Sequence, residues 1–90
     1  MATEPETALT PWGSAAIVEQ VAIAQRSGEK RFTTVVQLLE IDGGERVVRF
    51  AYTTGGSARR GPVTLRSRDL GRLRALVRDR PELAAALGFS

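Results

Sequence analysis

Residues 31–54, RFTTVVQLLEIDGGERVVRFAYTT, predict the centre of the fold. The first eleven of these residues are rich in β-branched and aromatic side chains, which favour a strand. Residues 42–44, Asp-Gly-Gly, are a strong turn signal, and a second run of strand-forming residues follows at 46–54. We therefore expect a β-hairpin over this stretch.

The two predicted strands differ in the character of their faces. The first is partly apolar on both faces, with Val36 on one and Val35 on the other, so it needs cover on both sides or a partner chain. In the second, Phe50 and Tyr52 point to one face and Arg49 to the other, because side chains alternate along a strand.

Two further segments lead from the hairpin toward the C-terminus. Residues 55–61, GGSARRG, are glycine-rich and basic, which predicts a flexible loop. Residues 62–66, PVTLR, are expected to form a short third strand that begins with a proline.

The C-terminal part of the chain has a helical pattern. Ser67 is a good N-cap, and Leu70, Leu73 and Val77 then recur at helical spacing, which predicts that they belong to the core. Residues 81–87, PELAAAL, begin with proline and are followed by glycine, which predicts a last short helix.

The N-terminal part also suggests a helix. Residues 1–9 are expected to be a flexible tail, and Thr10-Pro11 resembles a helix start because threonine can cap and proline suits the first turn. Residues 11–26 are alanine-rich, and Gly28 supplies a stop. The apolar residues that would share one helical face are Ile17, Val21 and Ala24.

These segments together predict an α+β fold. Its order is an N-terminal helix, a small antiparallel β-meander, a C-terminal helix and a short last helix, all within a single domain of residues 10–90. A chain of 90 residues builds a small core, and three strands leave two unpaired edges. We therefore expect a homodimer.

The net charge of +3 conceals a strong asymmetry. Residues 1–45 carry three basic side chains against seven acidic ones, whereas residues 46–80 carry ten arginines against two aspartates. Such a one-sided field attracts polyanions. Arginine also outnumbers lysine twelve to one, and a compositional bias of this kind can produce a merely solvated basic surface. It is the clustering of the arginines that favours an anionic partner.

The residue inventory argues against an enzyme. The chain contains no cysteine and no histidine, so the serines have no histidine partner, and the glycine pairs lack the lysine of a phosphate-binding loop. No catalytic residue, metal site or cofactor is predicted. The first ten residues hold two glutamates and no basic residue, unlike a secretory signal, so a cytoplasmic location is expected, without a membrane partner.

Basic and aromatic residues are mixed in the second half of the chain, as in proteins that bind single-stranded nucleic acid. Such proteins follow phosphates with cationic side chains and stack bases on aromatic rings. Core packing explains Phe50 better, and a solvated helix face explains Arg72, Arg74 and Arg78 better. The candidate nucleic-acid-binding residues are Arg46, Arg49, Tyr52, Arg59, Arg60 and Arg66.

Residues 59–73, RRGPVTLRSRDLGRL, resemble the signature of the transcriptional coactivator positive cofactor four family. The opening Arg-Arg-Gly, the Val-Thr-Leu strand and the helix anchors Leu70 and Leu73 carry the resemblance, which extends over about residues 30–87. The chain departs from the signature at Pro62, an extra residue, and at Leu70, where the family usually has tryptophan.

This resemblance implies a homodimer of small antiparallel sheets that binds single-stranded or melted DNA with little sequence preference and has a role in transcription or DNA maintenance. The leading prediction is therefore a non-catalytic nucleic-acid-binding protein that prefers single-stranded DNA. One alternative is a protein–protein interaction module acting through the basic C-terminal half. The other, a small enzyme or ligand-binding homodimer, has no residues to support it.

Overall fold

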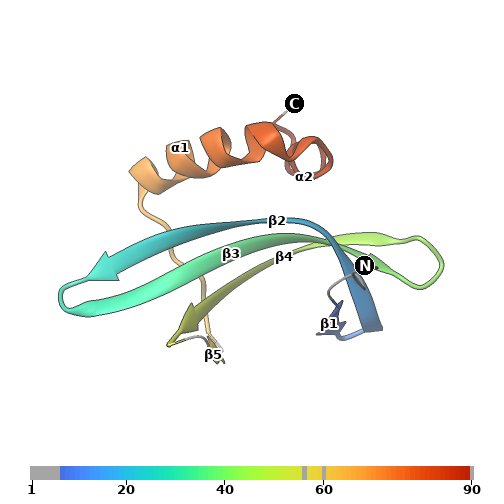
Figure 1. Ribbon diagram of the computed structural model, residues 1–90, viewed down its shortest axis with the longest axis horizontal. Coiled ribbons are helices and arrows are strands. Elements are labelled where there is room, and N and C mark those ends of the chain that lie inside the picture. Colours follow the sequence, from blue (N-terminus) through green and yellow to red (C-terminus); the bar gives the residue numbers. More distant parts are fainter. Residues whose placement is uncertain (1–6, 56, 60, 90) are drawn as a thin grey trace, which may run out of the picture.

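The structure is a computed structural model that describes residues 7–55, 57–59 and 61–89. Across these residues one antiparallel sheet has the strand order β1-β2-β3-β4-β5, so each strand pairs with its neighbour in sequence. The helices α1 and α2 lie on one side of this sheet (Figure 1). The elements are β1 (Thr7–Thr10), β2 (Gly13–Ser27), β3 (Lys30–Ile41), β4 (Arg46–Thr54), β5 (Ser57–Arg59), α1 (Ser67–Leu76), the 3₁₀ turn η1 (Val77–Asp79) and α2 (Pro81–Leu87).

The N-terminal helix predicted over residues 11–26 is wrong, because this segment forms the long strand β2. Thr10 does not cap a helix. Its Oγ1 accepts a hydrogen bond from the backbone N–H of Trp12 at 3.1 Å and donates one to the carbonyl of Gly13 at 2.7 Å. These bonds close a tight turn between β1 and β2, in which Pro11 and a glycine at positive φ are both favoured. The fold is therefore mostly antiparallel sheet with two short C-terminal helices, and the α+β prediction is corrected accordingly.

The apparent helical stripe of β2 is divided between the two faces of the sheet. A β-bulge between Ile17 and Glu19 shifts the register with β3 by one residue, which moves the following side chains to the opposite face. Ile17 consequently packs beside the smaller core cluster, Val21 enters the larger one, and Ala24 is exposed. Pairing with the apolar strand β3 outweighs the helix propensity of the alanines, which is a weak preference.

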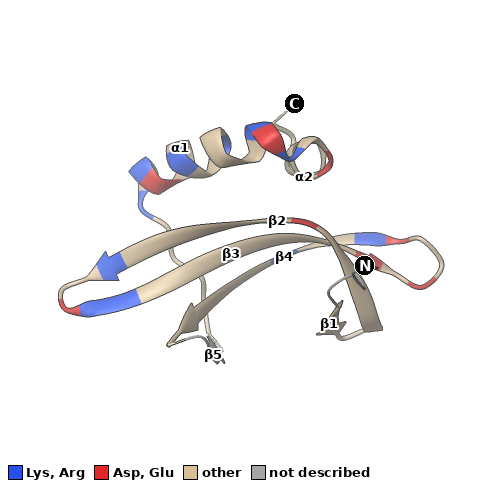
Figure 2. Ribbon diagram, viewed as in Figure 1, with Lys and Arg blue, Asp and Glu red and all other residues tan. Residues whose placement is uncertain are grey.

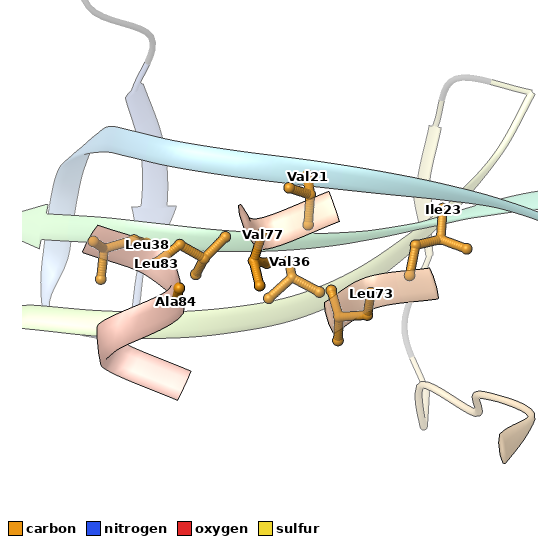
Figure 3. Packing of buried hydrophobic residues seen from close by; sticks show 8 residues of the cluster. All are labelled: Val21, Ile23, Val36, Leu38, Leu73, Val77, Leu83 and Ala84. Carbon is orange, nitrogen blue, oxygen red and sulfur yellow. The ribbon is translucent and has the colours of Figure 1, made fainter. Parts of the chain in front are cut away.

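The main core lies between the sheet and the helices. Antiparallel partners share a face, so Val21 and its partner Val36 project together toward α1 and α2. Leu73 and Val77 meet them from the helical side and are 2% and 1% exposed. Figure 3 shows this packing, and the buried members of the cluster are Val21, Ile23, Val36, Leu38, Leu73, Val77, Leu83 and Ala84.

A second, smaller cluster lies on the opposite face of the sheet. Ala15, Leu39 and Ile41 are buried there, with Ala8 of β1 packed against them. The chain thus covers part of each face of β3, which accounts for its apolar residues on both sides. Residues 7–9, expected in a flexible tail, belong to β1, while residues 1–6 lie outside the described residues.

The C-terminal helices form at the expected positions, with one correction to the core. Leu73 and Val77 are buried as predicted, but Leu70 is 49% exposed. The inward face of α1 follows a spacing of four, so Asp69, one residue before Leu70, lies inward in its place. The helix N-cap position is also one residue earlier than predicted, at Arg66, with no side-chain capping bond.

The third strand predicted over residues 62–66 is wrong as well. This segment has no regular structure, and the short strand β5 lies just before it, inside the predicted basic loop. Pro62 cannot donate a hydrogen bond to a strand ladder, which favours a connection here. Leu65 packs against the main core and so guides the chain from β5 to α1.

Candidate nucleic-acid interface

Two adjoining hollows lie where the β2–β3 turn, the end of β4 and the start of α1 come together. The larger, of about 930 Å³, is called here the arginine hollow, and the smaller, of about 580 Å³, the aromatic hollow. Both are lined by Arg31, Phe32 and Thr64, so they share a wall. Together they form what we call the basic cleft.

Exposed cations from several elements line the basic cleft. The arginine hollow is lined by Arg26, Arg31, Arg66, Arg68 and Arg72. The aromatic hollow adds Lys30 and Arg59. Figure 2 shows basic residues gathered at the adjacent ends of β2 and β3 and at the start of α1. Among the described residues that line the two hollows, Asp69 is the one acid.

Asp69 is buried and held in a polar network that joins α1 to the sheet. Its Oδ2 accepts a hydrogen bond from Nε2 of Gln25 at 3.1 Å, and its Oδ1 lies 3.0 Å from Nη1 of Arg72. Oε1 of Gln25 in turn accepts a hydrogen bond from the hydroxyl of Thr34, which is fully buried. Burial alone would raise the pKa of Asp69, but the bonds from Arg72 and Gln25 and the charge of Arg72 outweigh it, so the pKa is lowered.

Two arginines of the cleft also touch the backbone of β2. Nη1 of Arg72 donates to the carbonyl of Ala24 at 3.4 Å, and Nη2 of Arg66 to the carbonyl of Arg26 at 3.5 Å. Both distances are at the long end for a hydrogen bond. These guanidinium groups are thus placed near the strand by weak contacts, and most of each side chain is left at the surface.

The aromatic hollow contains a pair of rings. The ring centroids of Phe32 and Tyr52 are 6.3 Å apart, and the ring planes meet at 79°. Both residues are half-buried, and Tyr52 lies directly across from Arg59 in the β4–β5 pairing. A cation and two rings therefore share one short stretch of surface.

The predicted site residues fall into three groups. Tyr52, Arg59 and Arg66 line the basic cleft. Arg60 lies outside the described residues. Arg46 and Arg49 do not line the cleft.

Arg46 begins β4, at the end of the strand away from the cleft. Its Nε lies 3.2 Å from a carboxylate oxygen of Glu40, and its Nη1 lies 2.8 Å from one of Glu82. Hydrogen bonds to Glu82 and Glu40 raise the pKa of Arg46. Its charge is therefore largely balanced where it stands.

Arg49 points to the sheet face opposite the helices. Its Nε donates to Oε1 of Gln37 at 2.9 Å, and its Nη1 donates to the carbonyl of Leu9 at 2.9 Å. Gln37 also donates to Gln20, so a polar row crosses three strands and ties β1 to the sheet. The structure thus gives Arg49 a stabilising position.

Sequence reasoning missed several residues that line the cleft. Arg26 and Arg31 are direct partners across β2 and β3, a pairing that the predicted helix concealed. Reading Gly28 as a hairpin turn would have brought them together, since its φ of +62° suits a turn. The other basic and aromatic cleft residues not among the predicted candidates are Lys30, Phe32, Arg68 and Arg72.

Comparison of the chain with protein-family models, with curated proteins and with solved structures found no match. No described helix is both long enough and apolar enough to cross a membrane. Within the described part of the chain, no three acidic side chains come together as a metal-binding group.

Proposed function

We propose that the protein is a non-catalytic nucleic-acid-binding protein that holds single-stranded DNA in the basic cleft. The observation that carries the proposal is that seven exposed cations line one cleft, which also contains a pair of aromatic rings. Cations that follow phosphates, combined with rings on which bases stack, are the recurring chemistry of single-strand binding. The low density of acidic groups along the cleft supports the same function.

The arrangement favours a single strand over a duplex. A duplex keeps its bases stacked inside, whereas the rings of Phe32 and Tyr52 can contact only bases that are unstacked. Phosphate contacts carry no sequence information, so the binding has low sequence specificity. Such binding suits a role in transcription or DNA maintenance in the cytoplasm.

A titration with fluorescently labelled oligonucleotides tests this function. The chain is titrated onto single-stranded DNA, double-stranded DNA and single-stranded RNA of equal length, each at several salt concentrations. We expect the tightest binding to single-stranded DNA, with a steep loss of affinity as salt rises. The matched variants are Arg31→Gln, inside the cleft, and Arg74→Gln, exposed on α1 but outside it. Equal affinity of the two variants would contradict the proposed site.

The competing function is a protein–protein interaction module that uses the same basic surface for an acidic partner. It predicts weak oligonucleotide binding that does not depend on Phe32 or Tyr52. Absence of measurable single-strand binding at low salt would reject the nucleic-acid function and leave this one.

We propose in addition that the protein forms a homodimer through the edge of β2. β1 pairs with β2 only as far as Ala16, and from Ile17 to Ser27 the described strand pairs with β3 alone. The part of this edge before Ala24, whose carbonyl is bonded to Arg72, has no strand partner among the described residues, and such an edge is a template for another strand.

A further inference from the structure

The two hollows of the basic cleft differ in chemistry although they share a wall. The arginine hollow is lined by arginines of β2, β3 and α1, and guanidinium groups suit a phosphate. The aromatic hollow is lined by Phe32, Tyr52 and Pro62, which suit a flat apolar group. A ligand that fills both must carry an anion and a planar ring a short distance apart. A nucleotide unit has this composition.

The aromatic pair forms a corner rather than a flat platform. Because the planes of Phe32 and Tyr52 meet at 79°, a planar group stacked on one ring is nearly perpendicular to the other. It then meets the second ring edge to face, which is also a favourable contact. The corner therefore suits one stacked base and does not form a continuous stacking surface.

The corner is held by the sheet before any ligand arrives. Phe32 lies on β3 and Tyr52 on β4, and Thr34 lies directly across from Tyr52 in the register of these strands. Thr34 is fully buried and is tied through Gln25 to Asp69 on α1. A site placed on paired strands loses little conformational entropy on binding.

The cations are distributed so that the phosphates of a strand can pass along the corner. Arg31 lines both hollows, while Lys30 and Arg59 line the aromatic hollow alone. The two hollows together thus present more cations than the phosphate of one nucleotide requires. This distribution fits a nucleotide that is part of a strand better than a free nucleotide.

We infer that the aromatic hollow is a subsite for one nucleobase, and that the arginine hollow binds the phosphate next to it. The base enters the Phe32–Tyr52 corner, and Arg31 stands between the two subsites. This division of the cleft rests on the proposed single-strand binding and adds to it a contact that depends on a base rather than on charge.

The test compares a single-stranded oligothymidylate with an abasic oligomer that has the same number of phosphates and no bases. For the unaltered protein, loss of the base should weaken binding about 5- to 150-fold while the salt dependence stays the same. Phe32→Leu and Tyr52→Leu should weaken binding to the oligothymidylate and leave binding to the abasic oligomer unchanged. Phe50→Leu is the matched control, since Phe50 lies on the same strand as Tyr52, is 43% exposed and does not line the hollow.

The outcomes separate the two proposals. Equal affinity for the two oligomers, with a normal salt dependence, would overturn the base subsite and leave single-strand binding intact. Failure to bind either oligomer would overturn both. If thymidine monophosphate displaced the oligothymidylate at an equal concentration of nucleotide units, the base subsite would stand. Its ligand would then be a free nucleotide, and the inference that the base belongs to a strand would be overturned. The comparison of the oligothymidylate with the abasic oligomer uses the unaltered protein, so it tests the base subsite even if a substituted protein fails to fold.

Discussion

Nη1 of Arg72 lies 3.0 Å from Oδ1 of Asp69, and this ion pair joins an exposed guanidinium to a carboxylate that is 4% exposed. The pair lies within the first turns of α1, and Gln25 of β2 completes the partners of the carboxylate. The buried carboxylate of Asp69 thus has a structural role: it anchors the start of α1 to the sheet and orients Arg72 at the surface.

This arrangement predicts that stability depends on the charge of Asp69. Its folded-state pKa is lowered from the ordinary value of 3.8, so its contribution is present above that value and is lost as pH falls through the folded-state pKa. Asp69→Asn should lower Tm at pH 7, and the difference from the unaltered protein should shrink below about pH 4. Thermal unfolding followed by circular dichroism between pH 7 and pH 2.5 measures it. Glu45→Gln, at an exposed position of the β3–β4 turn, is the control and should leave Tm unchanged.

The packing of α1 predicts unequal effects for two of its leucines. Leu73 is 2% exposed within the main core, so Leu73→Ala should destabilise the fold by roughly 2–5 kcal/mol. Leu70 is 49% exposed, so Leu70→Ala should change stability by less than about 0.5 kcal/mol. Urea denaturation at pH 7 measures both. Similar losses for the two variants would show that the helix is rotated from the position described.

The parts of the fold that could be predicted from the sequence are those in which one local signal dominates. The β3–β4 hairpin follows from an Asp-Gly-Gly turn between β-rich runs, and α2 follows from Pro81 and Gly88 at its ends. The identity of β2 could not be read in this way, because alanine favours a helix and the bulge at Ile17 splits its apolar residues between two faces. Pairing with β3 decides whether residues 13–27 form a strand or a helix. Such pairing depends on residues distant in the sequence, so a local pattern does not reveal it.

The candidate site was affected by the same error. Tyr52, Arg59 and Arg66 were found because they lie in a visibly basic stretch of sequence, and they do line the cleft. Arg26 and Arg31 were missed because they belong to the acidic half of the chain and meet only across the β2–β3 hairpin. The arginine-rich stretch of the sequence thus identified some of the cations of the cleft, and pairing of the strands brings the others beside them.

The edge of β2 that lacks a strand partner among the described residues predicts how the proposed dimer can be blocked. The backbone carbonyls of Ala24 and Arg26 accept hydrogen bonds from Arg72 and Arg66, so they point away from β3. The backbone of Ala22 points the same way, because this direction alternates from residue to residue along a strand. Ala22 is exposed, and Ala22→Lys places a charge on the edge where a second copy would pair. We expect sedimentation at micromolar concentration to show a dimer for the unaltered chain and a species near 9.7 kDa for the variant. A chain that sediments only near 9.7 kDa without the substitution would contradict the dimer.

The last prediction separates the arginines that the sequence could not distinguish. Each arginine that neutralises one phosphate of a single strand adds about 0.7 to the slope of log affinity against log salt. Arg31→Gln and Arg66→Gln should therefore each flatten the slope by about 0.7, because both side chains line the arginine hollow. Arg49→Gln should leave the slope unchanged, since this side chain is bonded to Gln37 and Leu9 on the other face of the sheet.

Arg46 gives an independent comparison for the same measurement. It lies between Glu40 and Glu82 at the far end of β4, so Arg46→Gln should also preserve the slope, even where it alters Tm. Anisotropy titrations of the four variants at four salt concentrations provide the slopes, and melting curves identify any variant that is not folded. If Arg46 and Arg49 flattened the slope while Arg31 and Arg66 did not, the strand would bind outside the basic cleft. The location of the site would then have to be revised, although the affinity for nucleic acid would stand.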